Sequence, residues 1–246
     1  MKLLPGKGAE ARPLLEAALA EFERLGLPDG VGWCHHHLGW AAIVDGEYDQ
    51  ARDHLERAVD VARSDPLGEW LEPHALAALA PLVAVSGDGK RALRLANEAE
   101  AAARRLPARP VLAMALTRAA ETAVLVNEPG CAAGILVELL GILADLGARR
   151  WVADALETAA LVLQAEKDAE RASAILGASD RLREAAGEAR GGVRVLAEEL
   201  RHVRGRLASA LGAERVAQHE ARGRALSRKA AITLALAGLT TRGHGV

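Results

Sequence analysis

Residues 37–59 read HLGWAAIVDGEYDQARDHLERAV, two helix-forming segments joined by a short turn. The first segment carries a small residue at Gly39. The second repeats small or apolar side chains at Ala51, Leu55 and Ala58, a spacing that keeps one face of a helix apolar. Asp45 and Gly46 are typical turn residues. The stretch therefore predicts a helical hairpin whose two helices approach closely.

The same arrangement returns along most of the chain. The alanine of the second helix recurs as Ala11, Ala51, Ala92, Ala132 and Ala172, at separations of 40, 41, 40 and 40 residues. The small residue of the first helix recurs as Gly39, Ala80, Ala120 and Ala160, and turn signals recur at Asp45-Gly46, Gly87-Asp88-Gly89, Asn127-Glu128-Pro129 and Lys167-Asp168. A generic helical bundle rich in Ala and Leu gives no reason for so constant a register. We therefore predict a repeat protein.

Composition agrees with a helical, water-soluble chain. Of 246 residues, 50% are apolar and only 2% aromatic, and 31 Lys and Arg nearly balance 33 Asp and Glu. This excludes a protein that wraps nucleic acid or binds a membrane surface by bulk charge. Apolar stretches such as residues 75–86 are shorter than the roughly 20 residues of a membrane span, so none is expected. Two distant cysteines and no leader at Met1 predict reduced thiols in the cytoplasm.

The spacings of residues 37–59 resemble the tetratricopeptide repeat (TPR), although the unit here is 40 residues rather than roughly 34. The expected fold is an all-α, TPR-like right-handed α-solenoid of about four 40-residue hairpins, with an N-terminal half-repeat and C-terminal capping helices. The expected boundaries are a half-repeat at 1–28, full repeats at 29–66, 67–107, 108–147 and 148–187, and a cap at 188–246 whose last residues we expect to be disordered.

The two ends of the array lead to further expectations. The half-repeat holds only one helix, 10–25, so the chain is a piece of a longer protein, a mis-started reading frame, or a homodimer that covers this helix through Leu14, Leu15 and Phe22. After Gly187 the period stops, and we expect helices at 192–211, 213–222 and 228–236, the last capped by Ser227.

The prolines give local predictions. Pro66, Pro73, Pro110 and Pro129 stand where helices are expected to begin, as proline prefers the first helical position. Pro81 falls inside the expected helix at 75–85, where it removes one backbone donor and should bend the helix.

Two runs near the C-terminus resemble the C-terminal tetratricopeptide region of large actinobacterial LuxR-family and SARP-type ATP-binding transcription regulators. They are ILGASDRLRE at 175–184 and ARGRALS at 221–227. The resemblance implies a sensor or regulatory arm. The chain lacks a phosphate-binding loop, because GDGK at 87–90 has neither the spacing nor the Ser or Thr required. Only a short segment follows Leu236, so we expect neither ATP hydrolysis nor direct DNA binding.

The first helix of each hairpin faces the concave side of a tetratricopeptide solenoid, so its outward positions form the predicted groove for a protein or peptide ligand. These positions are Trp33, His36, Trp40, His74, Met114, Thr117, Arg118, Glu121, Asp154 and Glu157. Clustered indoles suit an anchor pocket. The alternative for Trp33 and Trp40 is packing against the half-repeat.

Other chemistry finds little support. Cys34 and His35–His37 lack two further metal ligands at a fixed spacing, and no nucleophile stands beside a base, so we predict no metal, no cofactor and no enzymatic activity. Residues 181–229 hold twelve Arg and Lys against six Asp and Glu, which we interpret as a solvated helix face rather than a nucleic-acid site. The alternatives to peptide binding are a solenoid that binds a small-molecule effector and a structural solenoid that self-associates.

Overall fold

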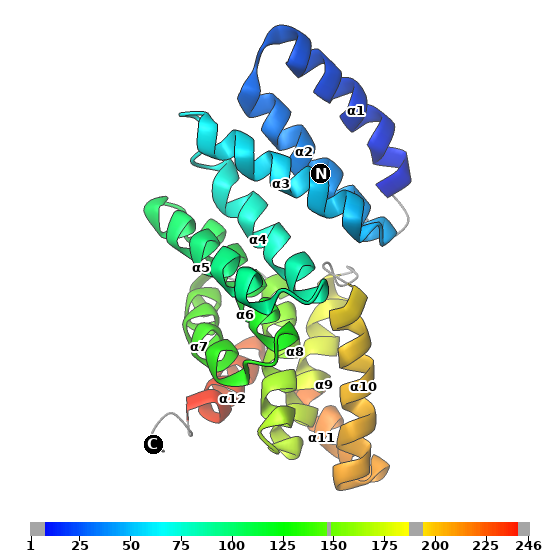
Figure 1. Ribbon diagram of the computed structural model, residues 1–246. Helices are drawn as coiled ribbons and strands as arrows, with labels where there is room; N and C mark the ends of the chain where they lie inside the picture. Colours follow the sequence, from blue (N-terminus) through cyan, green and yellow to red (C-terminus); the bar gives the residue numbers. More distant parts are fainter. Residues whose placement is uncertain (1–7, 147–148, 187–193, 241–246) are drawn as a thin grey trace. The chain divides into compact units, whose positions relative to one another are not determined.

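The computed structural model describes residues 8–146, 149–186 and 194–240, and this part of the chain is α-helical without any strand (Figure 1). The helices are α1 (Gly8–Leu25), α2 (Pro28–Asp45), α3 (Tyr48–Ser64), α4 (Leu71–Val85), α5 (Gly89–Arg105), α6 (Arg109–Leu125), α7 (Pro129–Leu146), α8 (Arg149–Ala165), α9 (Ala169–Ala186), α10 (Arg194–Leu211), α11 (Ala213–Ala225) and α12 (Arg228–Thr240). The predicted all-α fold is confirmed.

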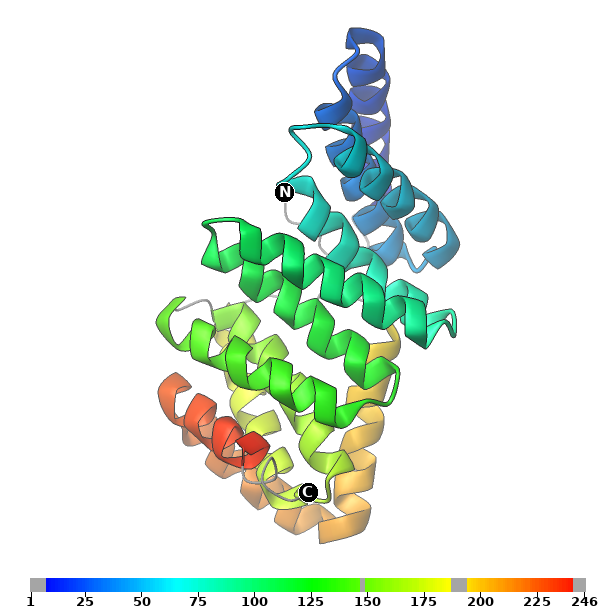
Figure 2. The ribbon, with the colours of Figure 1, turned by 60° about the vertical axis from the view of Figure 1, so that its left-hand side comes forward.

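Consecutive helices form the predicted hairpins. The pairs α2–α3, α4–α5 and α8–α9 pack along their lengths, and α6 and α7 follow each other across the same kind of turn (Figures 1 and 2). The recurring alanine of the second helix is buried in each hairpin, as the pattern predicts: Ala51, Ala92, Ala132 and Ala172 are all 0% exposed. A Cβ at Gly39 would collide with the Leu55 side chain, so a small residue is required where the first helix meets the second.

The turn inside each hairpin has one residue in the left-handed region. These residues are Gly46 (φ 82°), Gly87 (φ 94°), Asn127 (φ 61°) and Lys167 (φ 67°). The next backbone N–H then donates to a carbonyl five residues earlier, as in Glu47 to Ala42 and Asp168 to Leu163, both at 2.8 Å. The four turn signals in the sequence therefore mark one backbone motif, which Asn and Lys adopt at a higher conformational cost than Gly.

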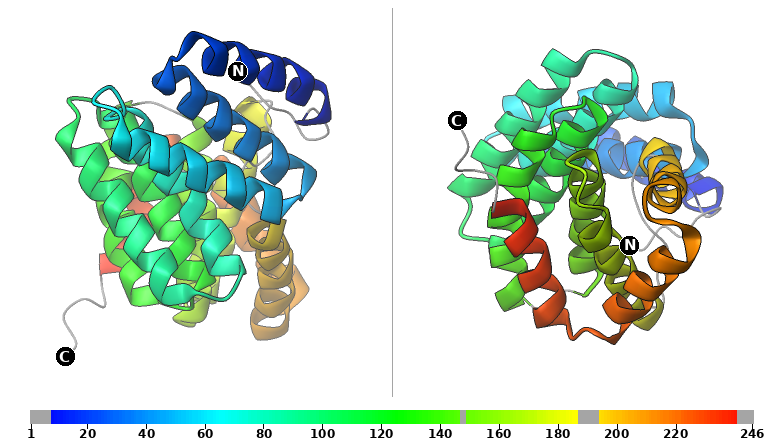
Figure 3. Two further views of the ribbon diagram at one scale, coloured as in Figure 1. Left: turned by 45° about the horizontal axis from the view of Figure 1, so that its top comes forward. Right: turned by 90° about the horizontal axis from the view of Figure 1, so that it is seen from below.

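The contacts divide the chain into two compact units, with the boundary inside α6. The N-terminal unit, residues 8–122, stacks α1 to α5 so that each helix packs on the next. The C-terminal unit comprises residues 123–146, 149–186 and 195–240, in which α11 packs on α9 and α12 packs on α7, α8 and α9 (Figure 3). The expected start of a cap at residue 188 stays a prediction.

The packing of α11 on α9 depends on two glycines. A Cβ at Gly177 would overlap the backbone of Glu220, and a Cβ at Gly223 would overlap the backbone of Ala174. The two runs that carried the resemblance to transcription regulators, 175–184 and 221–227, therefore lie against each other in one helix crossing. Ser227 caps α12 as predicted, since its hydroxyl accepts the N–H of Ala230 at 3.2 Å.

Two local expectations about prolines meet different outcomes. Helix α4 begins at Leu71, so Pro66 lies in the preceding turn rather than at a helix start. There the Asp65 side chain accepts the N–H of Leu67 at 3.0 Å and stabilises the turn. Pro81 lies inside α4, which continues to Val85, and the bend at Pro81 stays a prediction.

Helix α7 is relevant to the expectation that the chain has no membrane span, which stays a prediction. Among the described residues, it alone has the length and composition needed to cross a membrane, with 18 residues and a mean hydropathy of 1.7. A core helix passes the same test, and α7 buries Leu136, Leu139, Leu140 and Leu143 completely while it packs on α8 and α12. Its apolar composition is thus used in the packing of the C-terminal unit.

Candidate functional site

The strongest concentration of rings in the described chain lies where α2 meets α4 in the N-terminal unit. The Trp33 ring lies 5.3 Å from that of His74 and 5.6 Å from that of His36, and His36 and His74 lie 6.0 Å apart. His37, which the predicted groove did not include, stacks on Trp33 at 6.0 Å. Trp33 and His74 are half-buried, whereas His36 is 5% exposed. The structure thus brings together three predicted residues from two helices.

Trp40, about two helical turns beyond Trp33 on α2 and also half-buried, meets α6. The guanidinium of Arg118 lies 5.4 Å from the centre of its ring, a cation–π contact. Arg118 also forms an ion pair with Glu121 at 2.5 Å, with side chains only 8% and 0% exposed. Trp40 therefore packs against α6 as well as lining the face of α2, α4 and α6.

The remaining predicted residues of α6 lie on the same face at different depths. Thr117 is 4% exposed and donates its hydroxyl to the carbonyl of Ala113 at 2.7 Å. Met114 is half-buried and is a flexible side chain that adapts to irregular surfaces. A bound segment could thus reach Trp33, Trp40, His74 and Met114, whereas the buried members of the face shape its floor.

Asp154 and Glu157 belong to the C-terminal unit and are 1% and 6% exposed. Arg183 of α9 binds both, donating to Asp154 at 2.8 Å and to Glu157 at 2.8 Å, and the Ser179 hydroxyl donates to Glu157 at 3.0 Å. The second carboxylate oxygen of Asp154 has no hydrogen-bond partner in the part of the chain that the structure describes. These two carboxylates join α8 to α9, and their burial leaves little surface for a ligand.

The sequence reasoning missed Arg183 and Ser179. Both lie in the run 175–184, which carries the resemblance to regulators, and Arg183 also belongs to the basic stretch 181–229. The hairpin register held a usable signal, because antiparallel α8 and α9 bring residues near 154 opposite residues near 183. An acidic pair in a first helix and an arginine near the end of the second therefore predicts an ion pair across the hairpin.

The histidines of the N-terminal unit are held neutral by burial. Desolvation lowers the pKa of His35 from 6.5 to about 4, with the charges of His54 and Arg57 adding to the shift. Desolvation also lowers the pKa of His36, His37, His54 and His74. In addition, His35 and His54 share one hydrogen bond between their Nδ1 atoms at 3.0 Å, which requires one of the two nitrogens to be unprotonated.

Acid is therefore expected to destabilise the N-terminal unit. Each folded pKa lies below the unfolded value, so the unfolded chain binds more protons and stability is lost as pH falls below about 6.5. The lowered pKa of His35 alone should reduce the free energy of unfolding by about 3 kcal/mol between neutral pH and pH 4. Urea unfolding between pH 7.5 and 5 measures the effect. His35→Gln should flatten the pH dependence of the free energy of unfolding. An equal slope in wild type and His35→Gln would contradict this assignment.

Metal binding finds no support in the geometry. Within residues 8–146, 149–186 and 194–240, no group of three or more His, Cys, Asp or Glu side chains is arranged to hold a metal ion. Cys34 is buried and Cys131 exposed, and neither forms a disulfide within the described residues. Within the described residues, the histidine side chains therefore pack as rings against one another and against Trp33, without the arrangement of a metal site.

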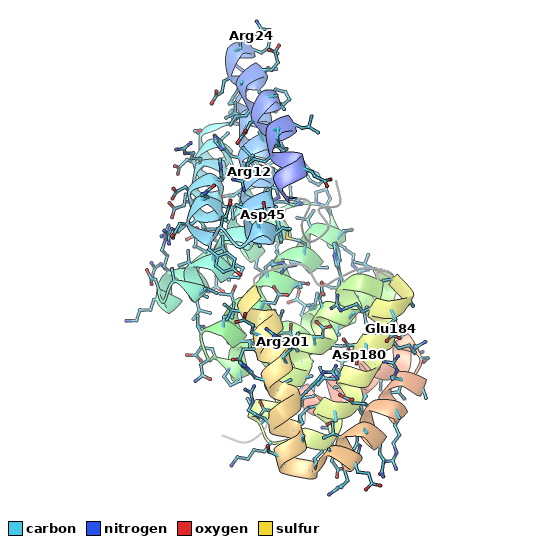
Figure 4. All side chains as sticks on the ribbon, turned by 90° about the vertical axis from the view of Figure 1, so that its right-hand side faces the viewer. Arg12, Arg24, Asp45, Asp180, Glu184 and Arg201 are labelled. Carbon is cyan, nitrogen blue, oxygen red and sulfur yellow. The ribbon has the colours of Figure 1, made fainter. Side chains whose placement is uncertain are left out.

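The basic stretch 181–229 is locally neutralised. Arg204 binds Asp180 at 2.9 Å and Glu220 at 2.5 Å, and Arg224 binds Glu184 at 2.6 Å, where Asp180 and Glu184 project from α9 (Figure 4). Because these arginines are paired with carboxylates, the excess positive charge of the stretch does not form a free phosphate-binding stripe at these positions.

Comparison with known proteins bears on α1 to α3. A family model described as tetratricopeptide repeat matches residues 5–64. The match supports a tetratricopeptide repeat region at residues 5–64. No curated protein matches the chain. The matched residues, 5–64, include α1 and the α2–α3 hairpin that carries Trp33, His36 and Trp40. Tetratricopeptide repeats commonly mediate contacts between proteins and are typically not enzymes.

Proposed function

We propose that this protein is a non-enzymatic tetratricopeptide repeat module of the cytoplasm that binds a peptide or protein segment on the face of α2, α4 and α6. The observation that carries the proposal is the pair of half-buried indoles, Trp33 beside His74 and Trp40 beneath Arg118. Half-buried aromatic rings fixed by neighbours are effective anchors, because little side-chain freedom is lost on binding.

The finer role is that of a sensor or regulatory arm of a transcription regulator of the LuxR or SARP type. It is supported by the resemblance of residues 175–184 and 221–227 and by the fact that both runs serve one helix crossing. In this role the bound segment is a protein partner, and neither direct nucleic-acid binding nor membrane association is needed. Two cysteines that form no disulfide within the described residues agree with a reducing compartment.

A selection of displayed peptides against the full chain tests the binding face. Peptides that bind the wild type should bind a Trp33→Leu/Trp40→Leu variant about tenfold or more weakly, because Leu keeps apolar packing but removes both rings. Trp151→Leu is the matched control, since Trp151 is a half-buried indole on α8. Fluorescence anisotropy measures the affinities. Peptides that bind the double variant as tightly as the wild type would contradict the assigned face.

Binding of a small-molecule effector is a second candidate, favoured by a pocket of about 320 Å³ in the C-terminal unit. Its lining is mostly apolar, including Val124, Leu161 and Val162, and Arg206 reaches Gln164 at 2.9 Å and Glu199 at 3.2 Å within it. The volume lies at the lower end of the range for ligand sites. The affinity of a ligand for this pocket should be unchanged in the Trp33→Leu/Trp40→Leu variant, because both tryptophans lie in the N-terminal unit.

Self-association through α1 is the remaining candidate. Leu14 is 74% exposed, while Leu15 and Phe22 are half-buried and the Phe22 ring lies against Gly30 of α2. Only Leu14 of the three thus offers a largely free side chain, and sedimentation of wild type and Leu14→Ser would reveal whether it holds two copies together.

A further inference from the structure

Large apolar side chains are exposed at two turns of the N-terminal unit that lie on one edge. Because helices alternate in direction, the α1–α2 turn and the α3–α4 turn stand at the same end of the stack, and both lie on the left in Figures 1 and 3 (left panel). The residues are Leu25 (49% exposed), Leu27 (48%), Leu67 (70%) and Trp70 (42%). We call these four side chains the apolar edge.

The α1–α2 turn holds its leucines in place. Gly26 has a φ of 63°. Its N–H donates to the backbone carbonyl of Glu23 at 3.1 Å, and the N–H of Leu27 donates to the backbone carbonyl of Phe22 at 3.0 Å. These two bonds close the chain tightly between the helices. Leu25 and Leu27 are therefore presented by an ordered turn.

The α3–α4 turn is equally well defined. Gly68 packs so closely on Ala62 that a Cβ would overlap its backbone, and Asp65 accepts the N–H of Leu67. The Trp70 carbonyl accepts a hydrogen bond from the His74 ring at 2.8 Å, which joins the turn to α4. An indole and a leucine held at the surface by fixed backbone lose little freedom on binding, as in the central anchors of protein interfaces.

The charges around the apolar edge are mainly negative. Residues 21–29 and 63–72 hold six carboxylates against two arginines. Arg24 (Figure 4) forms an ion pair with Glu21, and Arg63 forms ion pairs with Glu72 and Glu98. In contrast, Glu23, Asp29 and Glu69 form no ion pair with a described residue. The surface ends at the next turn on this edge, which Arg104, Arg105 and Arg109 flank.

We propose that the apolar edge is a second docking surface, which binds a basic amphipathic helix of a partner protein. Apolar side chains of that helix would cover Leu25, Leu27, Leu67 and Trp70, and its Lys or Arg residues would face Glu23, Asp29 and Glu69. Charge complementarity selects the sign of the partner, and burial of the apolar anchors supplies the affinity. The surface is separate from the face of α2, α4 and α6, although Trp70 and His74 connect the two.

Two synthetic helix-forming peptides of 18 residues test the proposal, one of Leu and Lys in an amphipathic order and one with Glu in place of Lys. Fluorescence anisotropy with the full chain should show saturable binding of the Leu/Lys peptide and none of the Leu/Glu peptide. Leu67→Ser/Trp70→Ser should weaken binding about tenfold or more, and Glu23→Lys/Glu69→Lys should weaken it by a similar factor. Glu214→Lys is the control for the charge reversal, since Glu214 is exposed on α11 in the other unit.

The outcomes that overturn the proposal are distinct. Equal binding of both peptides removes the charge argument, and full affinity in Leu67→Ser/Trp70→Ser removes the anchors. A loss caused by Trp33→Leu/Trp40→Leu but not by Leu67→Ser/Trp70→Ser places the peptide on the other face. Sedimentation showing that Leu67→Ser/Trp70→Ser dissociates a dimer of the wild type would make the occupant a second copy of this chain. Circular dichroism of each variant checks that the fold is retained.

Discussion

Gly223→Ala is expected to lower the free energy of unfolding by about 3 kcal/mol, as a severe case of overpacking. The added methyl group would overlap the backbone of Ala174 in α9, and backbone atoms cannot rotate away as a side chain can. The helices α9 and α11 must separate, which exposes apolar surface in the C-terminal unit. Gly177→Ala should have a similar effect because its Cβ would overlap the backbone of Glu220.

Gly205→Ala provides a control of opposite sign. Gly205 lies inside α10, and a Cβ there meets nothing within 4 Å. Alanine should therefore stabilise the helix by about 0.5–1 kcal/mol, the usual gain from removing the flexibility of glycine. Urea unfolding followed by circular dichroism compares the three variants. If Gly223→Ala were as stable as the wild type, the close crossing of α9 and α11 would be wrong.

Arg183→Leu is expected to destabilise the protein by about 3–5 kcal/mol, because it removes the cation that binds two buried carboxylates. The loss should affect the Asp154 carboxylate most, since it is 1% exposed and its other oxygen has no hydrogen-bond partner among the described residues. Glu157 would keep the hydrogen bond from Ser179. Thermal or urea unfolding measures the loss directly.

Two further variants separate the ionic effect from lost packing. Arg183→Leu combined with Asp154→Asn and Glu157→Gln should recover part of the stability, because the buried charges are then removed. Arg201→Leu should change stability by less than about 0.5 kcal/mol, since Arg201 is exposed on α10 and its only ion pair with a described residue is with Glu198 at 3.7 Å. A triple variant no more stable than Arg183→Leu would show that the arginine acts through packing alone.

The helical hairpins could be predicted from the sequence because their signals are local. Small residues at Gly39 and Ala51 mark where two helices touch, and the turn signals at Gly46 and Asn127 mark left-handed residues. Helix ends were predicted to within a few residues, as with Ser227 before α12. Pro66 was assigned wrongly because proline serves equally well in a turn.

The candidate site was only partly accessible to the same reasoning. Helical spacing placed Trp33, His36 and His74 on one face, and the structure shows their rings together. Spacing cannot state depth, so it did not distinguish half-buried Trp33 from Glu121, which is 0% exposed. Depth depends on which neighbouring helices cover a position, and those neighbours are far away in the chain.

The sequence by itself determined the repeat, the hairpin register and the all-α fold, because a period of 40 residues repeats the same local preferences and the same points of close approach. Only the tertiary structure decided that Gly177 meets the backbone of Glu220, that Arg183 neutralises Asp154, and that Leu67 and Trp70 remain exposed. These facts depend on contacts between helices that are distant in the chain, whose distances and burial no periodic pattern specifies.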